Sequence, residues 1–154
     1  MDDSGVIERI HLAPREGEPM ERVESVEAVA RRGLRGDRYF RDEGTFADRE
    51  GSDVTFIEAE TLAAVERDYD IELTAGSHRR NVTTRGVALN HLVGERFRVG
   101  EMQCEGIELC EPCSYLERQL EKAGIREALV HRGGLRATVL DGGTVAAGEE
   151  IRPD

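Results

Sequence analysis

The sequence predicts a mostly β protein with some α-helix, an α+β fold in which a β-barrel carries a few short helices. Many short segments have β-branched residues at near-alternating positions, glycine-rich turns separate them, and only a few stretches have a helical period. Short strands joined by such turns are typical of barrels and sandwiches. A chain of 154 residues suffices for one core, so we expect a single domain over residues 1–154.

The first half of the chain contains three kinds of pattern. Strands are predicted at 5–12 and 22–30, with a proline-containing loop between them. Residues 33–51 are rich in Gly, Arg and Asp without a consistent period, so we predict a long functional loop there. A short buried strand at 54–57 precedes an amphipathic helix at 58–70.

The second half alternates short strands with glycines. Strands are predicted at residues 80–84, 96–99, 102–109, 135–140 and 144–147. We expect a turn of helix at 88–92, and Gly142-Gly143 is predicted to be the turn between the last two strands. Ser114 and Glu117 form a capping-box pattern that predicts a helix to about residue 123, with a further helical piece at 125–131.

The chain is strongly acidic. Acidic residues outnumber basic ones 32 to 21, the formal net charge is −11, and Lys122 is the only lysine. We expect such a surface in a cytoplasm at very high salt, where screening weakens self-repulsion, so we predict a halophilic source. The alternative is an ordinary acidic protein from a GC-rich genome. A role in nucleic-acid binding is disfavoured, because no basic stripe offsets the negative charge.

Membrane and export signals are not evident in the sequence. No apolar run approaches the roughly 20 residues that span a bilayer. The first residues, Met1-Asp2-Asp3-Ser4, lack the basic start and apolar stretch of a signal peptide. We therefore expect a cytoplasmic protein without a membrane partner.

Three cysteines, Cys104, Cys110 and Cys113, lie in one short segment. In a reducing cytosol such a cluster indicates metal binding or thiol chemistry before a structural disulfide. If Ser114 caps a helix, the Cys113 thiol lies at the helix N-terminus, where the backbone amides favour the thiolate. The alternatives are half a zinc site, a redox Cys-x-x-Cys pair, and two buried cysteines that fill core space.

Arginines supply the remaining candidate site residues. Arg79-Arg80-Asn81 stands where a loop enters a strand, and two guanidinium groups plus an amide suit an oxyanion and a heterocycle edge. Surface arginines that neutralise acids such as Glu72 are the alternative. In Gly36-Asp37-Arg38, a buried Asp–Arg pair would fix the loop, while Arg35 would face an anion. The segment 131–136 is either a nest of backbone amides for an anion or a simple turn.

Taken in order along the chain, these motifs resemble the MOSC domain, named for the C-terminal domain of molybdenum cofactor sulfurase. The matching segments are Gly-Leu-Arg-Gly-Asp-Arg-Tyr at 33–39, Val-Thr-Phe-Ile-Glu-Ala-Glu at 54–60, Arg-Arg-Asn at 79–81, Leu-Val-Gly-Glu-Arg-Phe-Arg-Val-Gly at 92–100, Cys-Glu-Pro-Cys at 110–113 and Arg-Gly-Gly-Leu-Arg-Ala at 132–137. The resemblance is to the stand-alone prokaryotic type and covers the chain from about Val6 onward. It implies a MOSC-type β-barrel with a pocket that holds a cysteine.

The resemblance also implies site residues and a cofactor. The family cysteine falls on Cys113, and in relatives it carries sulfur as a persulfide or ligates the molybdenum of a pterin cofactor. In the cofactor-binding branch an Arg and an Asn two residues apart help to hold the cofactor, and these fall on Arg79 and Asn81. We add Arg80, Arg35 and Arg38 as candidate cofactor-binding residues. Relatives that donate sulfur carry a pyridoxal-phosphate domain upstream for which this chain has no room, so sulfur would come from a separate cysteine desulfurase.

Three functions are compatible with these residues. In the first, the domain binds the molybdenum cofactor through Cys113 and, with electrons from a donor protein, reduces a small N- or S-oxygenated substrate. In the second, Cys113 carries a persulfide and transfers sulfur to an acceptor. In the third, the domain binds the cofactor without catalysis. The sequence does not decide whether the protein is an enzyme; as one, it would be a molybdenum-cofactor-dependent oxidoreductase or a sulfurtransferase.

Overall fold

A closed β-barrel forms the centre of the molecule. The computed structural model describes residues 4–15, 19–37, 40, 53–71, 73, 79–109 and 133–154. The main sheet has the strand order β11-β7-β8-β9-β5-β6-β1-β2, and β11 also pairs with β1, so seven strands close into a ring. Its strands are β1 (Gly5–Leu12), β2 (Glu21–Val23), β5 (Val54–Glu58), β6 (Val82–Arg85), β7 (Arg96–Val99), β8 (Met102–Leu109), β9 (Leu135–Asp141) and β11 (Glu150–Pro153). The predicted mostly β fold with a barrel is confirmed.

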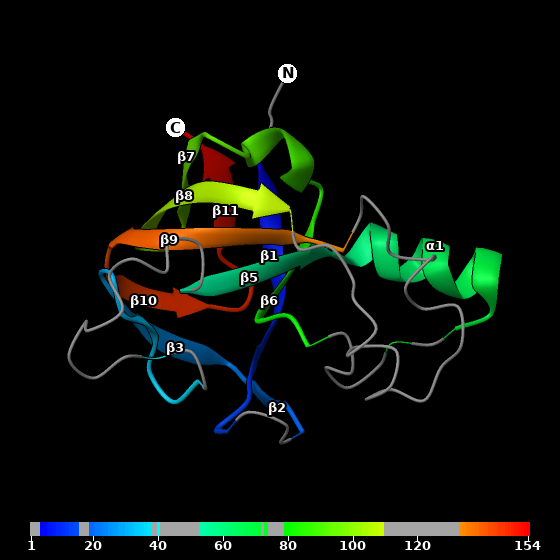
Figure 1. Ribbon diagram of the computed structural model, residues 1–154, viewed down its shortest axis with the longest axis horizontal. Coiled ribbons are helices and arrows are strands. Elements are labelled where there is room, and N and C mark those ends of the chain that lie inside the picture. The colour runs from blue at the N-terminus through cyan, green and yellow to red at the C-terminus, as the bar shows by residue number, and fades with distance from the viewer. Residues whose placement is uncertain are drawn as a thin grey trace.

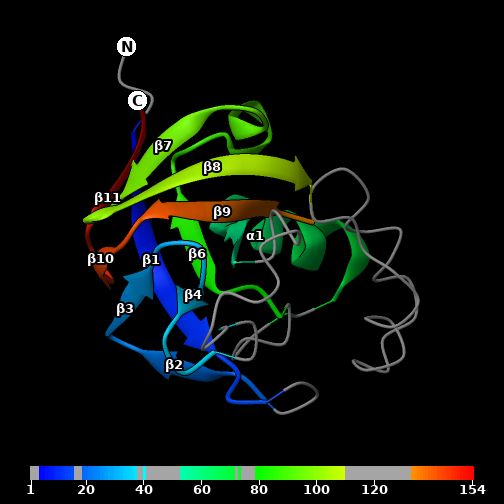
Figure 2. The ribbon, with the colours of Figure 1, turned by 60° about the vertical axis from the view of Figure 1, so that its left-hand side comes forward.

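Two sides of the barrel cross each other steeply. In Figure 1, β5, β8 and β9 run across the view, while β1 and β6 run nearly vertically behind them. Figure 2 shows the same crossing from the side. Neighbouring strands of the barrel are antiparallel, except that β5 and β6 are parallel. The chain between β5 and β6 includes the helix α1 (Ala59–Tyr69), because a parallel pair needs a crossover to bring the chain back.

The barrel interior is filled with apolar side chains. Phe56 and Phe97 are fully buried and meet edge to face, with ring centroids 5.5 Å apart. A register shift between Ile7 and Arg9 in the β1–β6 pairing allows Ile7 and Ile10, three positions apart, both to join the core. A short 3₁₀ helix, η1 (Leu89–Leu92), adds two buried leucines to the core near β5, β8 and β9. The described side chains of the interior therefore form a packed apolar core.

The helix α1 covers part of the outer face of the barrel. Ile57 of β5 points outward and packs with Val65 of α1 and with Ile71 and Leu73. The helix ends at Asp70, which has a left-handed backbone (φ 56°) and whose N–H donates to the carbonyl of Glu66. The predicted helix at 58–70 is confirmed apart from one residue at each end.

A second, three-stranded sheet lies beside the barrel and differs most from the predictions. It consists of β10 (Gly143–Ala146), β3 (Ser25–Val29) and β4 (Gly33–Leu34). The expected hairpin turn at Gly142-Gly143 is wrong, because β10 pairs with β3 and not with β9. The predicted strand at 22–30 is split at Glu24 into β2 and β3, which lie in different sheets.

Two short strands escaped prediction. β4 lies inside the segment predicted as a long loop, and β11, which closes the barrel, was not recognised. The rest of the predicted loop, the capping-box helix at 114–123 and the helical piece at 125–131 lie largely or wholly outside the described residues. Among the helices that the structure describes, none combines the length and the apolar character needed to cross a membrane.

Candidate functional site

Asn81 joins three strands at the point where the chain enters β6. Its Oδ1 accepts hydrogen bonds from the backbone N–H of Thr55 (3.0 Å) and from the Thr55 hydroxyl (3.1 Å), and its own N–H donates to Thr55 Oγ1 (3.0 Å). Its Nδ2 donates to the carbonyl of His11 on β1 (3.2 Å), and the N–H of His11 donates to the Asn81 carbonyl (2.7 Å). The Asn81 side chain is fully buried. The amide is therefore held in one orientation by the protein itself.

This network lies on the outer side of the barrel wall. Val54, Phe56 and Val82 belong to the interior core, and Thr55 and Asn81 alternate with them along β5 and the start of β6. Since successive side chains of a strand face opposite sides, Thr55 and Asn81 face the same side as Ile57, which α1 covers. The candidate site is thus supported by the wall of the barrel and does not lie in its interior.

Arg80 is a buried arginine with a defined partner. Its side chain is 7% exposed, and its Nε donates to the carbonyl of Gly133 at 2.8 Å. A buried guanidinium is tolerated only when hydrogen bonds compensate for its lost hydration. The interpretation as a surface arginine is therefore wrong for Arg80. The contact ties the entry of β6 to the first described residue after the segment 110–132.

Arg79 differs from its neighbour in exposure and in backbone conformation. It is half-buried, and its φ of 65° lies in the left-handed region, which a residue other than glycine rarely adopts. Such strained positions often occur at functional sites. The turn at Arg79 places a half-buried arginine directly beside the buried residues 80 and 81.

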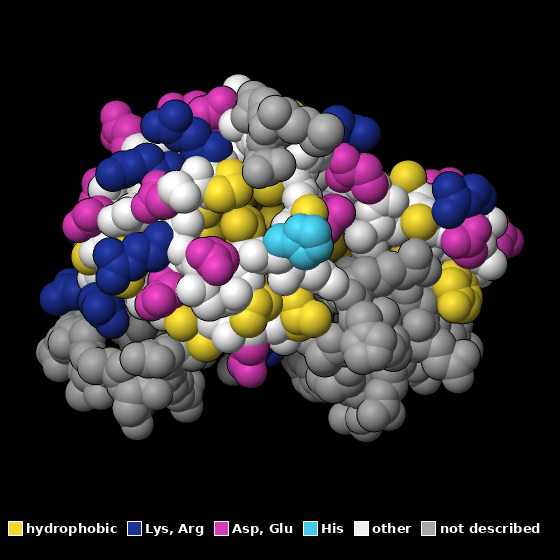
Figure 3. Space-filling view, turned by 90° about the horizontal axis from the view of Figure 1, so that it is seen from above, with side chains coloured by type: hydrophobic (Ala, Val, Ile, Leu, Met, Phe, Trp, Pro, Cys, Tyr) yellow, Lys and Arg dark blue, Asp and Glu magenta, His cyan; other side chains and the backbone are white. Residues whose placement is uncertain are grey.

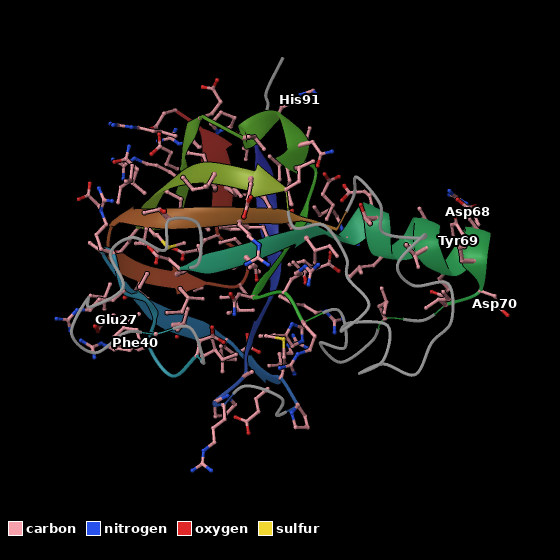
Figure 4. All side chains as sticks on the ribbon, viewed as in Figure 1. Glu27, Phe40, Asp68, Tyr69, Asp70 and His91 are labelled. Atoms are coloured by element: carbon pink, nitrogen blue, oxygen red, sulfur yellow. The ribbon has the colours of Figure 1, made fainter. Side chains whose placement is uncertain are left out.

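Arg35 belongs to a different part of the molecule. Its Nε binds Glu27 Oε1 at 2.5 Å, and its guanidinium lies over the ring of Phe40, 5.4 Å from the centroid. Figure 4 places Glu27 and Phe40 on the opposite side of the molecule from α1, the helix that covers the Asn81 face. The structure brings Arg79, Arg80 and Asn81 together and does not place Arg35 with them. Its predicted contact with a cofactor stays a prediction.

Asp37 is buried, as expected for a residue that fixes the loop after β4. Its Oδ1 accepts the N–H of Ala13 at 3.0 Å, which links this loop to the end of β1. Arg38, its predicted partner, lies outside the described residues. Gly36 has a left-handed φ (89°), which suits a tight turn at the start of this loop.

Of the three cysteines, Cys104 is the one that the structure describes. Cys104 lies in the middle of β8, is fully buried in the core, and has a pKa raised well above its usual value by burial, with Asp53 as a smaller cause. Cys104 is therefore a small buried residue of the apolar core. Cys110 and Cys113 lie outside the described residues, which end on this side at Leu109, the last residue of β8.

Several polar residues at the barrel wall were missed by sequence reasoning. Asp53 is 1% exposed and accepts the N–H of Val139 at 2.9 Å. Glu58 is half-buried and accepts the N–H of Leu89 at 3.2 Å, and burial is the main cause of its raised pKa. Thr55 was noted only as part of a buried strand; a hydroxyl within the apolar run 54–57 was the available signal. In the described part of the chain, no three His, Cys, Asp or Glu side chains are grouped to hold a metal.

Comparisons with known proteins agree with this architecture. The YuaD protein from Bacillus subtilis is similar with a TM-score of 0.82 at 14% identity, over 96% of this chain and 94% of that chain. YiiM from Geobacillus stearothermophilus gives 0.74 at 17% identity, over 97% and 75%. YiiM from Escherichia coli gives 0.67 at 17%, over 99% and 69%. Identities this low show a shared fold alone.

The family is shown by the sequence itself. No curated protein matches the chain significantly. A model of the MOSC domain, however, matches residues 11–152. The matched range includes the Arg79-Arg80-Asn81 segment and the barrel strands from the end of β1 to β11. The chain therefore belongs to the MOSC domain family, which is associated with binding of the molybdenum cofactor.

Proposed function

We propose that this domain binds the molybdenum cofactor, that the Cys113 thiolate ligates the molybdenum, and that the domain reduces N- or S-oxygenated compounds. The observation that carries the proposal is the buried framework of Thr55, Arg80 and Asn81 beside the half-exposed Arg79. This framework costs the protein a buried cation and a strained turn, which a barrel wall alone does not need.

The donors of this segment fit such a cofactor. A guanidinium binds phosphate oxygens through two parallel hydrogen bonds, and Arg79 is the arginine of the segment whose side chain is partly exposed. A thiolate is a soft ligand that suits a transition metal, and Cys113 follows the end of β8 by four residues. Arg79 would thus hold the phosphate, and Cys113 would hold the metal.

Arg80 and Asn81 have positioning roles in this proposal. Arg80 holds the carbonyl of Gly133, where the chain returns from the segment that contains Cys113. Asn81 holds β1 and β5 against the start of β6. A site kept in place by its own hydrogen bonds needs little rearrangement when the ligand binds.

The reaction needs a partner that supplies electrons. When bound, the cofactor supplies oxygen-atom transfer, in which the substrate N–O or S–O bond breaks and two electrons and two protons convert the released oxygen to water. The electrons would come from a separate donor protein, and we place the reaction in the cytoplasm. The chain's own residues would bind the cofactor and hold it in place.

The test is the metal content of the protein from cells that make the cofactor. We expect molybdenum and pterin at a near-stoichiometric ratio in the wild type, a large loss in Cys113→Ser, and a partial loss in Arg79→Ala. Cys110→Ser is the matched control and should retain the metal. A wild-type protein without molybdenum would overturn the proposal, and an additional sulfur atom on its Cys113 would indicate sulfur transfer in its place.

Turnover is a separate measurement. Loaded protein supplied with an electron donor should reduce an N-hydroxylated base, and Cys113→Ser should not. Full molybdenum loading without any turnover of N- or S-oxygenated compounds would retain cofactor binding and reject the proposed reduction.

A further inference from the structure

A cavity of about 370 Å³ lies at one end of the barrel, above the core. It is lined by the residues between β6 and η1, by two residues of η1, by Glu95 and by one residue of β11, namely Gly86, Val87, Ala88, His91, Leu92, Glu95 and Pro153. This is the volume range in which proteins bind small molecules. These described lining residues do not include any residue of the site proposed above.

The cavity has an apolar floor and a polar rim. Figure 3, which looks at the molecule from above, shows hydrophobic side chains in a hollow with a histidine at its edge. Figure 4 shows His91 projecting from η1 at this end of the molecule. Two of the large apolar side chains that are exposed among the described residues adjoin the cavity lining. Val6 pairs with Arg85, the residue before Gly86, and Val93 follows Leu92 in the chain. Exposed apolar side chains that gather around a hollow indicate a binding surface.

The walls of the cavity are held in place by hydrogen bonds from outside it. Glu60 Oε2 accepts the N–H of Gly86 at 2.7 Å, and Glu58 Oε2 accepts the N–H of Leu89 at 3.2 Å. On the other side, the carbonyl of Glu95 accepts the N–H of Gly106 at 3.0 Å. The cavity is therefore formed before any ligand enters, which reduces the cost of binding.

Among the described lining residues, Glu95 has the one acidic side chain, and none is Lys or Arg. Glu95 is an exposed residue of the lining, and its hydrogen bond with Gly106 of β8 is made by its backbone carbonyl. Glu58 is near enough to His91 for their charges to interact, and Glu60 lies beside Gly86. Arg85, next to Gly86 in the chain, is paired with Glu8 at 3.0 Å. Arg96, next to Glu95, is not among the lining residues.

From this combination we propose that the cavity binds a compact organic cation, with an apolar body on Val87, Leu92 and Pro153 and a primary ammonium group at Glu95. The apolar floor accepts the carbon skeleton, and the carboxylate selects the charge. His91, a further residue of the lining, contributes an imidazole ring to the rim. The site is independent of the proposed cofactor site, so either can fail without the other.

The test uses benzylamine, which is an ammonium ion at neutral pH, and benzyl alcohol, a neutral molecule of nearly the same shape. Backbone amide NMR shifts of the full-length ¹⁵N-labelled protein report binding at each residue. We expect saturable shifts at Ala88, His91 and Glu95 with benzylamine, at a dissociation constant on the order of 1 mM as for a small fragment. Benzyl alcohol should bind about tenfold more weakly, because it lacks the charge that Glu95 binds.

Two variants test the location, and one serves as control. Glu95→Gln should lower the affinity for benzylamine to that of benzyl alcohol, and Ala88→Phe, a change at an exposed residue, should fill the cavity and abolish both. Ala63→Phe, on an exposed position of α1, should change nothing. Equal affinities for the two compounds, shifts confined to other residues, or binding that survives in Glu95→Gln at full strength would each overturn the proposal.

Discussion

The inner and outer faces of β5 and β6 carry different kinds of side chain, although these alternate along the same strands. The inner face has Phe56 and Val82 in a fully buried apolar core. The outer face has Thr55 and Asn81 in a hydrogen-bond network beside two arginines. Neighbouring residues thus serve different purposes: one set builds the barrel and the other supports the candidate site. Substitutions one position apart should separate the two purposes.

The largest effect is expected on the inner face. Phe56→Ala removes a fully buried ring that contacts Phe97, and we expect it to lower the free energy of unfolding by about 3–5 kcal/mol. Urea denaturation of the purified variant measures this change. Phe56→Leu, which leaves a smaller cavity, should lower the free energy of unfolding clearly less. It replaces Phe56→Ala in the measurement if that variant does not fold. A change below about 1 kcal/mol for Phe56→Ala would show that the core is not packed as described.

On the outer face we expect a smaller loss of stability, and we expect the effects of changing Asn81 and Thr55 to depend on each other. Asn81→Ala leaves the buried N–H of Thr55 without its acceptor, and we expect a loss of about 1–3 kcal/mol. The combination with Thr55→Val, which removes the hydroxyl bonded to the same amide, should cost less than the sum of the two single changes. Strict additivity in urea denaturation would contradict the network.

The structural role of Asn81 affects how cofactor binding is tested. From the sequence alone, a double change of Arg79 and Asn81 to Ala is expected to weaken binding and to leave the fold intact. Because Asn81 joins three strands, the double variant should also lose stability. Arg79→Ala alone is the cleaner test of cofactor binding.

A third prediction concerns acid pH. Burial lowers the pKa of His11, and the charges of Arg9 and Arg22 lower it further. The unfolded chain therefore binds a proton more readily than the folded protein, so the stability linked to neutral His11 is present above about pH 6.5 and is lost as the pH falls. The free energy of unfolding should decrease from about pH 7.5 to about pH 5.5, and less so in His11→Gln. An equal decrease in both proteins would assign the acid sensitivity to other groups.

The smallest effect is expected from the exposed charges of the outer surface. With a formal net charge of −11 the molecule repels itself, and salt screens this repulsion. Exposed pairs such as Arg85–Glu8 contribute little that salt could remove. We expect the melting temperature to rise between low and multimolar KCl, as measured by circular dichroism. A melting temperature that stays level or falls would argue against adaptation to high salt.

The sequence predicted the barrel better than its closure. Strands with a clear alternation were found within about two residues of their observed bounds, because alternation is a local property. β11 has only four residues, and it pairs with β7 on one side and with β1 on the other. Because both partners are distant in the sequence, this pairing cannot be predicted from a local pattern. The hairpin at Gly142-Gly143 failed for the same reason, since the partner of β10 is the distant β3.

Within the candidate site, residue types were predictable and their burial was not. Two arginines followed by an asparagine indicate oxyanion binding in any exposed loop. The sequence could not show that Arg80 reaches the carbonyl of Gly133, 53 residues away, or that Asn81 is surrounded by Thr55 and His11. Such contacts depend on the crossing of strands that are distant in sequence. The family resemblance rests on the order of the motifs, and it does not show which of their residues are exposed and which are buried.

The most direct test of the account is the reactivity of the three cysteines, because Cys104 belongs to the buried core and Cys113 is the proposed metal ligand. Limited iodoacetamide labelling near neutral pH, read by peptide mass spectrometry, should mark Cys113 first in cofactor-free protein. Cys104 should stay unlabelled in the folded state, since it is fully buried and its pKa is raised. Bound molybdenum cofactor should protect Cys113. Faster labelling of Cys110, or a stable disulfide between Cys110 and Cys113 in freshly purified protein, would contradict the assignment and indicate a redox pair.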